Sequence, residues 1–275
     1  RTDVAQSEAR LARATAQRIE AEGNLTASRA VFQEVVGFLP GTLEAPPALE
    51  GLPASEQDVV GAARDDNPAV LSARFAEQAA RHQVRVTTGE LLPEVFLTAE
   101  LLHSENEFSD DSEISQARVL AVVSIPLYQQ GFVSSRVRQA KQDASRRRVE
   151  IVEARRRVEQ DAIDAWEALV TARAQIRSFQ SEVRSSEIAL EGVREENSVG
   201  QRTILDVLDA EQELLDAQVR LVRARRDEVV AAYRIQQVQG RLTAAELGLP
   251  VDVYDAEADY LAVRDRWFGL DIPEE

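Results

Sequence analysis

Residues 132–197 read FVSSRVRQAKQDASRRRVEIVEARRRVEQDAIDAWEALVTARAQIRSFQSEVRSSEIALEGVREEN, with no proline and with Gly192 as the only glycine. A continuous helix of this length extends about 100 Å at 1.5 Å per residue. Apolar residues recur along it at steps of three and four, with a mean spacing of about 3.5, the coiled-coil period. The stripe comprises Val137, Ala140, Ala144, Ile151, Val158, Ala162, Ala165, Leu169, Ala172, Ile176, Phe179, Val183, Leu190 and Val193. This pattern predicts one very long helix that pairs with other helices.

A second helix is predicted to return from about Thr203 to Leu242, after a turn at Ser198–Gln201. It carries two apolar stripes, offset by about one residue and hence by about 100° around the helix. The first is Leu205, Leu208, Leu215, Val219, Val222, Val229 and Tyr233, and the second is Val207, Ala210, Leu214, Ala217, Leu221, Ala224, Ala231, Ile235, Val238 and Leu242. Two seams predict a neighbour on each side, as in a larger bundle or a ring of helices closing into a tube.

Shorter helices are predicted before the long one. Residues 1–37 lack proline and read as one helix, and a linker rich in proline and glycine follows it. A short helix is predicted over Ser55–Asp66, with Ser55 as its N-cap and Asp58 as a capping-box partner. Another begins at Asn67-Pro68, with proline at the tolerated first position, and runs to about Glu90. This helix and the returning helix together total about 64 residues, so we expect them to stack end to end beside the long helix.

Two segments alternate with the period of a strand. In the first, Val95, Leu97, Ala99 and Leu101 alternate with Phe96, Thr98, Glu100 and Leu102, and in the second, Ala117, Val119, Ala121, Val123, Ile125 and Leu127 alternate with Gln116, Arg118, Leu120, Val122 and Ser124. The acidic segment from Glu105 to Glu113 between them reads as a polar loop. One apolar and one mixed face fit either a half-buried hairpin or the strands of a membrane barrel.

The composition argues against several classes of function. The net charge of -16 and the pI of about 4.7 disfavour nucleic acid as a partner. The chain has no cysteine, and its two histidines, His82 and His103, lack the spacing of metal ligands. There is no glycine-rich phosphate loop, and no apolar stretch is long enough for a transmembrane helix. We therefore predict no enzyme active site, no metal and no cofactor.

Residues 3–37 align without a gap onto residues 206–240, an internal repeat. Asp3-Val4 matches Asp206-Val207, Leu11 matches Leu214, and Gly37 matches Gly240. The chain also contains no methionine, even at position 1. Both observations predict that the chain is the C-terminal part of a longer protein, holding the last helix of a first repeat and then a full second repeat.

Five motifs in these segments resemble the outer-membrane efflux protein (TolC) family, in particular its type I secretion-like branch. They are Ser124-Ile125-Pro126-Leu127-Tyr128, Val199-Gly200-Gln201-Arg202-Thr203, the run from Ile204 to Glu211, Asn67-Pro68-Ala69-Val70, and a tail with Tyr254-Asp255, Tyr260 and Arg266-Trp267-Phe268-Gly269. The resemblance implies a mainly α fold with a small β part. Long antiparallel coiled-coil helices would form an α-barrel wall, and a β-hairpin would contribute to a transmembrane β-barrel.

The resemblance also divides the chain into six parts. They are the last helix of the first repeat (1–40), a linker and short helix (41–66), a helix of the second repeat (67–92), an outer-membrane β-hairpin (93–128), a long periplasmic helical hairpin (129–243) and a C-terminal tail (244–275). It further implies a homotrimeric channel in outer-membrane lipid that extends into the periplasm. Such a channel is a passive conduit for efflux or type I secretion and works with a periplasmic adaptor protein and an inner-membrane transporter.

The family resemblance assigns roles to residues near the turn. Asp206 and Asp209 match acidic residues of a pore constriction, where three copies would form two carboxylate rings that favour cations. Arg202 matches an arginine that helps to close the entrance, with Asp3 and Thr2 as its partners in a latch, whereas Asn197 replaces the family's aromatic residue. The alternatives are ordinary acids in a first helical turn, favoured by the helix dipole, and a solvated surface arginine. For the whole chain, the alternative is a non-membrane coiled-coil scaffold or adaptor protein with a small β-hairpin.

Overall fold

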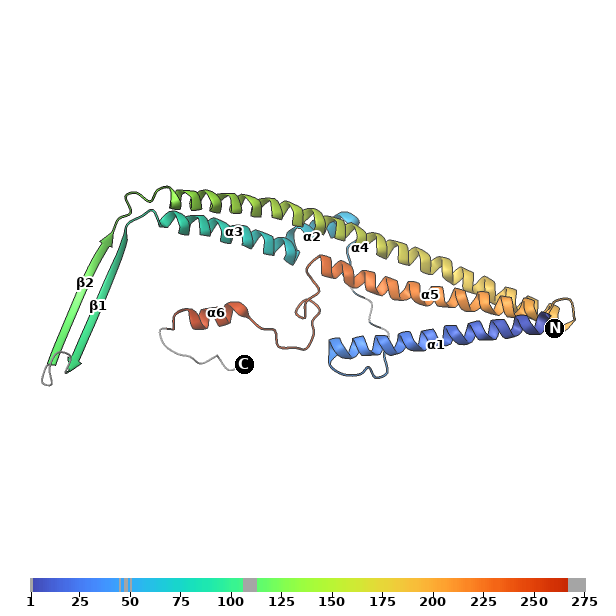
Figure 1. Ribbon diagram of the computed structural model, residues 1–275. Coiled ribbons are helices and arrows are strands. Elements are labelled where there is room, and N and C mark those ends of the chain that lie inside the picture. The colour runs from blue at the N-terminus through green and yellow to red at the C-terminus, as the bar shows by residue number, and fades with distance from the viewer. Residues whose placement is uncertain (1, 45, 47–48, 50, 106–112, 267–275) are drawn as a thin grey trace. The chain divides into compact units, whose positions relative to one another are not determined.

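The computed structural model describes residues 2–266 apart from 45, 47–48, 50 and 106–112, with the side chains of 2, 3 and 105 also left out (Figure 1). The order of elements is α1 (Thr2–Val36), α2 (Glu56–Asp66), α3 (Pro68–Gly89), β1 (Glu94–Glu105), β2 (Glu113–Ser124), α4 (Phe132–Ser198), α5 (Ile204–Val238) and α6 (Ala256–Arg264). The mainly α fold with a small antiparallel sheet is confirmed.

The chain divides into two compact units, and α4 runs through both. The first unit holds residues 1–54 and 164–237, and the second holds residues 55–163 and 238–275. The first therefore contains α1, nearly all of α5 and the C-terminal half of α4. The second contains α2, α3, the β-hairpin and the N-terminal half of α4.

The apolar stripe predicted for α4 is the face that the helix buries. Every one of its fourteen members is buried or half-buried, and Leu169 is only 1% exposed. Complete burial of one leucine contributes about 1.5–3 kcal/mol, so this seam accounts for much of the stability of the helix pairs. The 67-residue helix matches the range predicted from the absence of proline and glycine.

Of the two predicted seams of α5, the second is buried or half-buried along most of its length, whereas the first is half-buried at Leu205, Leu208 and Tyr233 and exposed between them. Val207, Ala217, Ala224, Ala231, Ile235 and Val238 of the second stripe are buried. In the first stripe, by contrast, Leu215 is 51% exposed and Val222 is 64% exposed. The helix itself ends at Val238, four residues before the predicted Leu242, because Gly240 turns the chain with φ +73°.

Side-chain caps fix the limits of α2 and α3. The hydroxyl of Ser55 accepts a hydrogen bond from the amide of Asp58 at 3.2 Å and donates to its carboxylate at 2.7 Å, which confirms the predicted N-cap of α2. Asn67 accepts from the amide of Ala69 at 2.8 Å, and Pro68 occupies the first position of α3. The same asparagine donates to the carbonyl of Val238 at 2.7 Å, so the N-cap of α3 contacts the C-terminal residue of α5.

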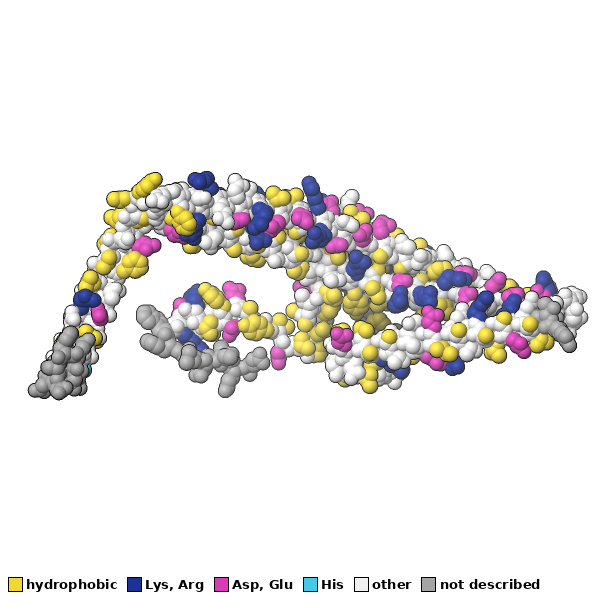
Figure 2. All heavy atoms as spheres, viewed as in Figure 1, with side chains coloured by type: hydrophobic (Ala, Val, Ile, Leu, Met, Phe, Trp, Pro, Cys, Tyr) yellow, Lys and Arg dark blue, Asp and Glu magenta, His cyan; other side chains and the backbone are white. Residues whose placement is uncertain are grey.

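β1 and β2 form an antiparallel hairpin with two unlike faces, attached to the same end of α3 and α4 (Figure 1). One face carries the pairs Val95–Val123, Leu97–Ala121, Ala99–Val119 and Leu101–Ala117. The other alternates apolar and polar side chains and includes an ion pair between Glu100 and Arg118. Figure 2 shows hydrophobic side chains exposed on the visible side of this hairpin.

The limits predicted for the second strand and for the loop before it are wrong. The second strand ends at Ser124, short of Ile125 and Leu127, because Pro126 has no amide hydrogen to donate to a ladder. Pairing extends instead to Glu105 and Glu113, into the predicted loop. The C-terminal tail contains a helix that was not predicted, α6, which the side chain of Asp255 caps by accepting from the amides of Glu257 and Ala258. Trp267, Phe268 and Gly269 of the tail motif lie outside the described residues.

Candidate functional site

The turn between α4 and α5 has a well-defined backbone. Gly200 lies in the left-handed region with φ +77°, its amide donates to the carbonyl of Asn197, and the amide of Gln201 donates to the carbonyl of Glu196, both at 2.9 Å. These two bonds form a Schellman motif, which ends a helix and satisfies its last carbonyls. The side chain of Asn197 also donates to the carbonyl of Arg202 at 2.9 Å, so this residue stabilises the turn.

Asp206 forms a capping box with Thr203 at the start of α5. Its carboxylate accepts from the backbone amide of Thr203 at 2.9 Å and from the threonine hydroxyl at 2.8 Å. The amide of Asp206 donates back to that hydroxyl at 3.3 Å. The hydrogen bond from the backbone amide, followed by that from the hydroxyl, lowers the pKa of Asp206. This carboxylate therefore stays ionised, and its bonded partners here are neutral donors.

Arg202 pairs with Glu196 of its own turn, with 2.8 Å between Nε and a carboxylate oxygen. The hydrogen bond with Glu196 raises the pKa of the Arg202 guanidinium. The side chains of Thr2 and Asp3, the predicted partners of Arg202 in a latch, lie outside the described residues. Sequence reasoning did not find Glu196, although a turn that reverses the chain at Gly200 brings positions 196 and 202 together.

Asp209 pairs with Arg10 of α1, with 2.5 Å between Nη1 and Oδ1. The hydrogen bond from Arg10 is the largest cause that lowers the pKa of Asp209, while the neighbouring Asp206 acts weakly in the opposite sense. Sequence reasoning missed Arg10 as well. The signal was present, because Arg10 follows Asp3 by seven residues and so lies on the same face of α1 two turns further along. The two acids predicted to act together thus have different partners.

Exposed ion pairs connect α5 to the antiparallel α4. They join Arg194 to Glu211 at 2.6 Å, Arg220 to Glu182 at 2.5 Å, and Arg173 to Glu228 at 3.1 Å. Each pair contributes less than about 1 kcal/mol to the free energy of unfolding, because both partners are solvated. The buried seam supplies the stability, and the ion pairs fix the register that places Asp206 and Asp209.

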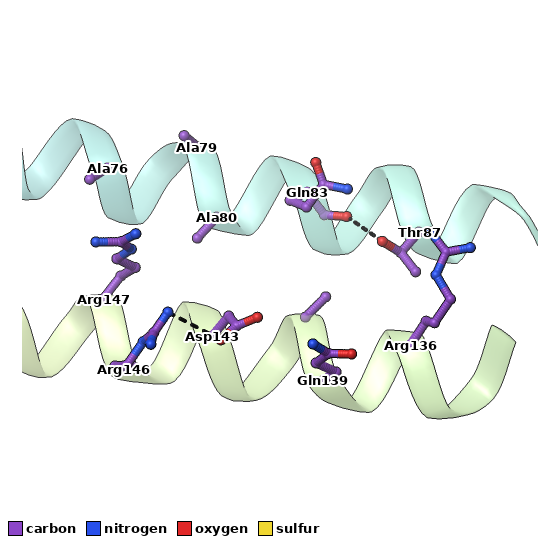
Figure 3. A pocket seen from close by; sticks show the side chains of 11 residues that line it. Ala76, Ala79, Ala80, Gln83, Thr87, Arg136, Gln139, Asp143, Arg146 and Arg147 are labelled. Carbon is purple, nitrogen blue, oxygen red and sulfur yellow. Dashed lines mark hydrogen bonds and ion pairs between the residues drawn. The ribbon is translucent and has the colours of Figure 1, made fainter. Parts of the chain in front are cut away.

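A groove of about 580 Å³ lies between α3 and α4, where small side chains leave space (Figure 3). Ala76, Ala79 and Ala80 line one side of it. Its charged side chains are already paired, since Arg136 binds Glu90, Arg146 lies 3.3 Å from Asp143, and Arg147 lies 2.8 Å from Glu150. The groove is therefore a loosely packed part of the helix seam and not an anion site.

Within the part of the chain that the structure describes, no group of three or more His, Cys, Asp or Glu side chains is placed to hold a metal ion. In the same residues, no helix is long and apolar enough to cross a membrane.

Long paired helices, a tight turn between α4 and α5 and a two-faced β-hairpin between α3 and α4 together define a class of long-helix channel subunits. Residues 59–241 match the model of the family described as "Outer membrane efflux protein", and the chain belongs to that family. It is thus part of a protein of the outer membrane. The resemblance recognised in the sequence is confirmed.

Named relatives agree with this membership. The chain is 37% identical over its whole length to the outer membrane efflux protein BepC of Brucella suis, and it covers 60% of that protein. It is 28% identical to the outer membrane protein TolC of Escherichia coli and 27% identical to the alkaline protease secretion protein AprF of Pseudomonas aeruginosa. In both matches 90% of this chain aligns with 53% of the relative.

Solved structures share the fold. The open state of the MtrE outer membrane channel of Neisseria gonorrhoeae superposes with a TM-score of 0.67 at 20% identity, over 80% of this chain and 51% of that one. The chain thus spans between half and two thirds of the length of the relatives that it matches.

Proposed function

We propose that the full-length protein is a subunit of a homotrimeric outer-membrane channel for efflux or type I secretion. It acts as a passive conduit, without enzymatic activity, between a periplasmic adaptor protein with its inner-membrane transporter and the cell exterior. The β-hairpin contributes strands to a transmembrane barrel in outer-membrane lipid, and the helices form part of the wall of a periplasmic tunnel. The alternative drawn from the sequence, a non-membrane coiled-coil scaffold with a small β-hairpin, does not fit membership of an outer-membrane family.

The two unlike faces of the hairpin carry this proposal. A strand of a membrane barrel alternates residues that face lipid with residues that face the lumen. The face with Leu97, Ala99, Val119 and Ala121 is wholly apolar over four successive pairs, and its members are exposed in the isolated chain. The opposite face holds Glu100 and Arg118, which are costly in contact with lipid and acceptable in an aqueous lumen.

The uncovered seam of α5 supports an assembly of several subunits. Its second stripe packs within this chain, whereas Leu215, Val219, Val222 and Val229 of the first stripe are exposed. A neighbouring subunit in a ring of helices would bury exactly such a seam on every copy. A two-helix scaffold, by contrast, requires only one.

The residues at the turn have proposed roles in the same channel. Asp206 and Asp209, near the start of α5, are proposed to line the pore constriction, where a threefold arrangement makes rings of carboxylates. Arg202 is proposed to form the entrance latch with Asp3 and Thr2 of a neighbouring repeat, exchanging its partner Glu196 for them. Unchanged conductance of an Arg202→Ala channel would remove the latch from this proposal.

The hairpin supplies a matched test in the full-length protein. Val119→Arg places a charge on the apolar face opposite Ala99, and Leu120→Arg places the same charge on the mixed face opposite Thr98. An arginine that faces lipid near the bilayer midplane costs about 2–4 kcal/mol, so we expect Val119→Arg to lose most of the detergent-extracted trimer. Leu120→Arg should retain it, because the charge faces water.

Yield of trimer from the outer membrane and channel activity in planar lipid bilayers are the measurements. Equal tolerance of the two substitutions would contradict the assignment of the faces. A full-length protein that is a monomer or dimer in water without detergent would overturn the proposed channel.

A further inference from the structure

An ion pair between Arg10 and Asp209 connects α1 to α5. The ribbons of these two helices are labelled in Figure 1. Both residues belong to the first compact unit. The arginine side chain is 35% exposed and the aspartate side chain 60% exposed, so the pair lies at the surface where α5 begins. Among the described residues, the other ion pair made by α1, Arg18 with Glu22, lies within that helix. Of the arginines of α1 that the structure describes, Arg10 is therefore the one that forms an ion pair with α5.

The two acids of the proposed constriction differ in their charge balance. Asp206 accepts from the amide and hydroxyl of Thr203, which are neutral donors, while the nearby guanidinium of Arg202 is paired with Glu196 and acts on Asp206 only as its weakest favourable partner. Asp209, one helical turn further along, is in direct contact with a guanidinium, so the pair has no net charge. Equal contributions from the two carboxylates would require equal environments, and the structure gives them unequal ones.

We propose that Arg10 sets the cation selectivity of the pore entrance by neutralising Asp209 within each subunit, so that of the two acids only Asp206 presents a carboxylate without a direct ion pair to the conducting path. This inference rests on the proposed function of Asp206 and Asp209 as constriction residues. The entrance then carries one ring of net negative charge and one ring of charge pairs, and a cation meets half the charge that the aspartates alone would supply.

The proposal makes the two partners act in opposite directions. Arg10→Gln frees the carboxylate of Asp209 and adds one negative charge for each subunit. Asp209→Asn leaves the guanidinium of Arg10 unpaired and adds one positive charge for each subunit. A purely structural tie between α1 and α5 would instead be lost in both variants, and both would shift the channel in the same direction.

The experiment uses the full-length channel in planar lipid bilayers, with hexamminecobalt(III) as the blocking cation. The concentration that halves the conductance, and the reversal potential in a KCl gradient, are measured for each variant. We expect Arg10→Gln to lower the half-blocking concentration roughly tenfold, because charges near a pore act strongly on a trivalent ion. Asp209→Asn should raise it, whereas Arg10→Lys should remain close to the unmodified channel.

The double variant Arg10→Gln with Asp209→Asn should restore a value near that of the unmodified channel, because both charges are removed together. A shift in the same direction for the two single variants, or an effect of Asp206→Asn without any effect of Arg10→Gln, would overturn the role of Arg10 and leave the proposed channel intact. If Asp206→Asn and Arg10→Gln both leave block and selectivity unchanged, the proposed constriction itself is wrong.

Discussion

α1 and α5 have similar apolar patterns in very different surroundings. At an offset of 203 residues, Val207, Leu214 and Ile235 of α5 correspond to Val4, Leu11 and Phe32 of α1. In α5, Val207 is 7% exposed and Ile235 is fully buried, whereas in α1 Val4 is 62% exposed and Leu11 is 69% exposed. The apolar pattern of a helix thus records a seam, and only the presence of a partner determines whether the seam is filled.

The largest expected effect comes from replacing an alanine of each helix with aspartate. Ala224 of α5 corresponds to Ala21 of α1 at the offset of 203 residues. Ala224 is 2% exposed and Ala21 is exposed in this chain. Ala224→Asp should destabilise the full-length protein by about 3 kcal/mol or more, because an unpaired charge enters a closed seam. The repeat predicts a second α4-like helix against α1, so Ala21→Asp should cost about as much in the full-length protein.

The midpoint of thermal unfolding of the full-length trimer, followed by loss of helical circular dichroism, measures both variants. A cost below about 0.5 kcal/mol for Ala21→Asp would show that the α1 seam stays open to solvent. The two halves of the internal repeat would then be similar in sequence but not in how their helices pack.

A smaller effect is expected at the two glycines that end these helices. Gly37 and Gly240 both have positive φ, at +92° and +73°. A Cβ on Gly240 would lie 2.6 Å from the carbonyl oxygen of Asp66 and 3.0 Å from Cδ of Pro68, whereas one on Gly37 would meet nothing within 4 Å. Gly37→Ala should cost about 1 kcal/mol for the backbone conformation alone. Gly240→Ala adds a steric clash and should cost about 2–3 kcal/mol.

The same unfolding midpoints separate the two glycine variants. Equal losses would mean that the contact between the end of α5 and the start of α3 adds nothing to the conformational strain. A larger loss in Gly37→Ala would reverse the comparison.

The smallest effect, and the one that depends on pH, belongs to the start of α5. The hydrogen bonds from Thr203 lower the folded-state pKa of Asp206. The contribution of this carboxylate to the free energy of unfolding is therefore fully present above its unfolded-state pKa of about 3.9, and it is lost as the pH falls through the lower folded-state pKa. Asp206→Asn should therefore be less stable than the unmodified protein at pH 7. The two proteins should converge once the pH falls below the lowered folded-state pKa of Asp206. Unfolding midpoints across this range are the measurement, and a constant difference would show that the effect is not titratable.

Much of the fold was predictable because its signals are local and repeated. The fourteen-residue stripe of α4, the cap at Ser55 and the alternation around Val119 each specify an element without knowledge of its neighbours. The end of the second strand was not predicted, since the apolar alternation continues through Ile125 and Leu127 although Pro126 breaks the ladder. The helix α6 was missed because it is short, and its side chains include no buried residue that would mark a face.

The candidate site was predictable in its members and less so in its pairings. Asp206, Asp209 and Arg202 were chosen from the motif at the turn, and the structure gives them the partners Thr203, Arg10 and Glu196. Charged side chains on exposed helices have several partners within reach, and small differences in rotamer and register decide between them. A sequence supplies the charges but not this choice.

The tight turn at Gly200 also has a consequence for the order in which the hairpin of α4 and α5 folds. The ion pairs that join these helices link residues 17, 38 and 55 positions apart, in order of distance from the turn. Closing a long loop costs entropy, but each pair that forms brings the next one close together. Folding from the turn outward, like a zipper, therefore never requires a long loop to close in one step. A very long hairpin of this kind can thus assemble through a series of short loop closures, although its native contacts join residues as much as 55 positions apart.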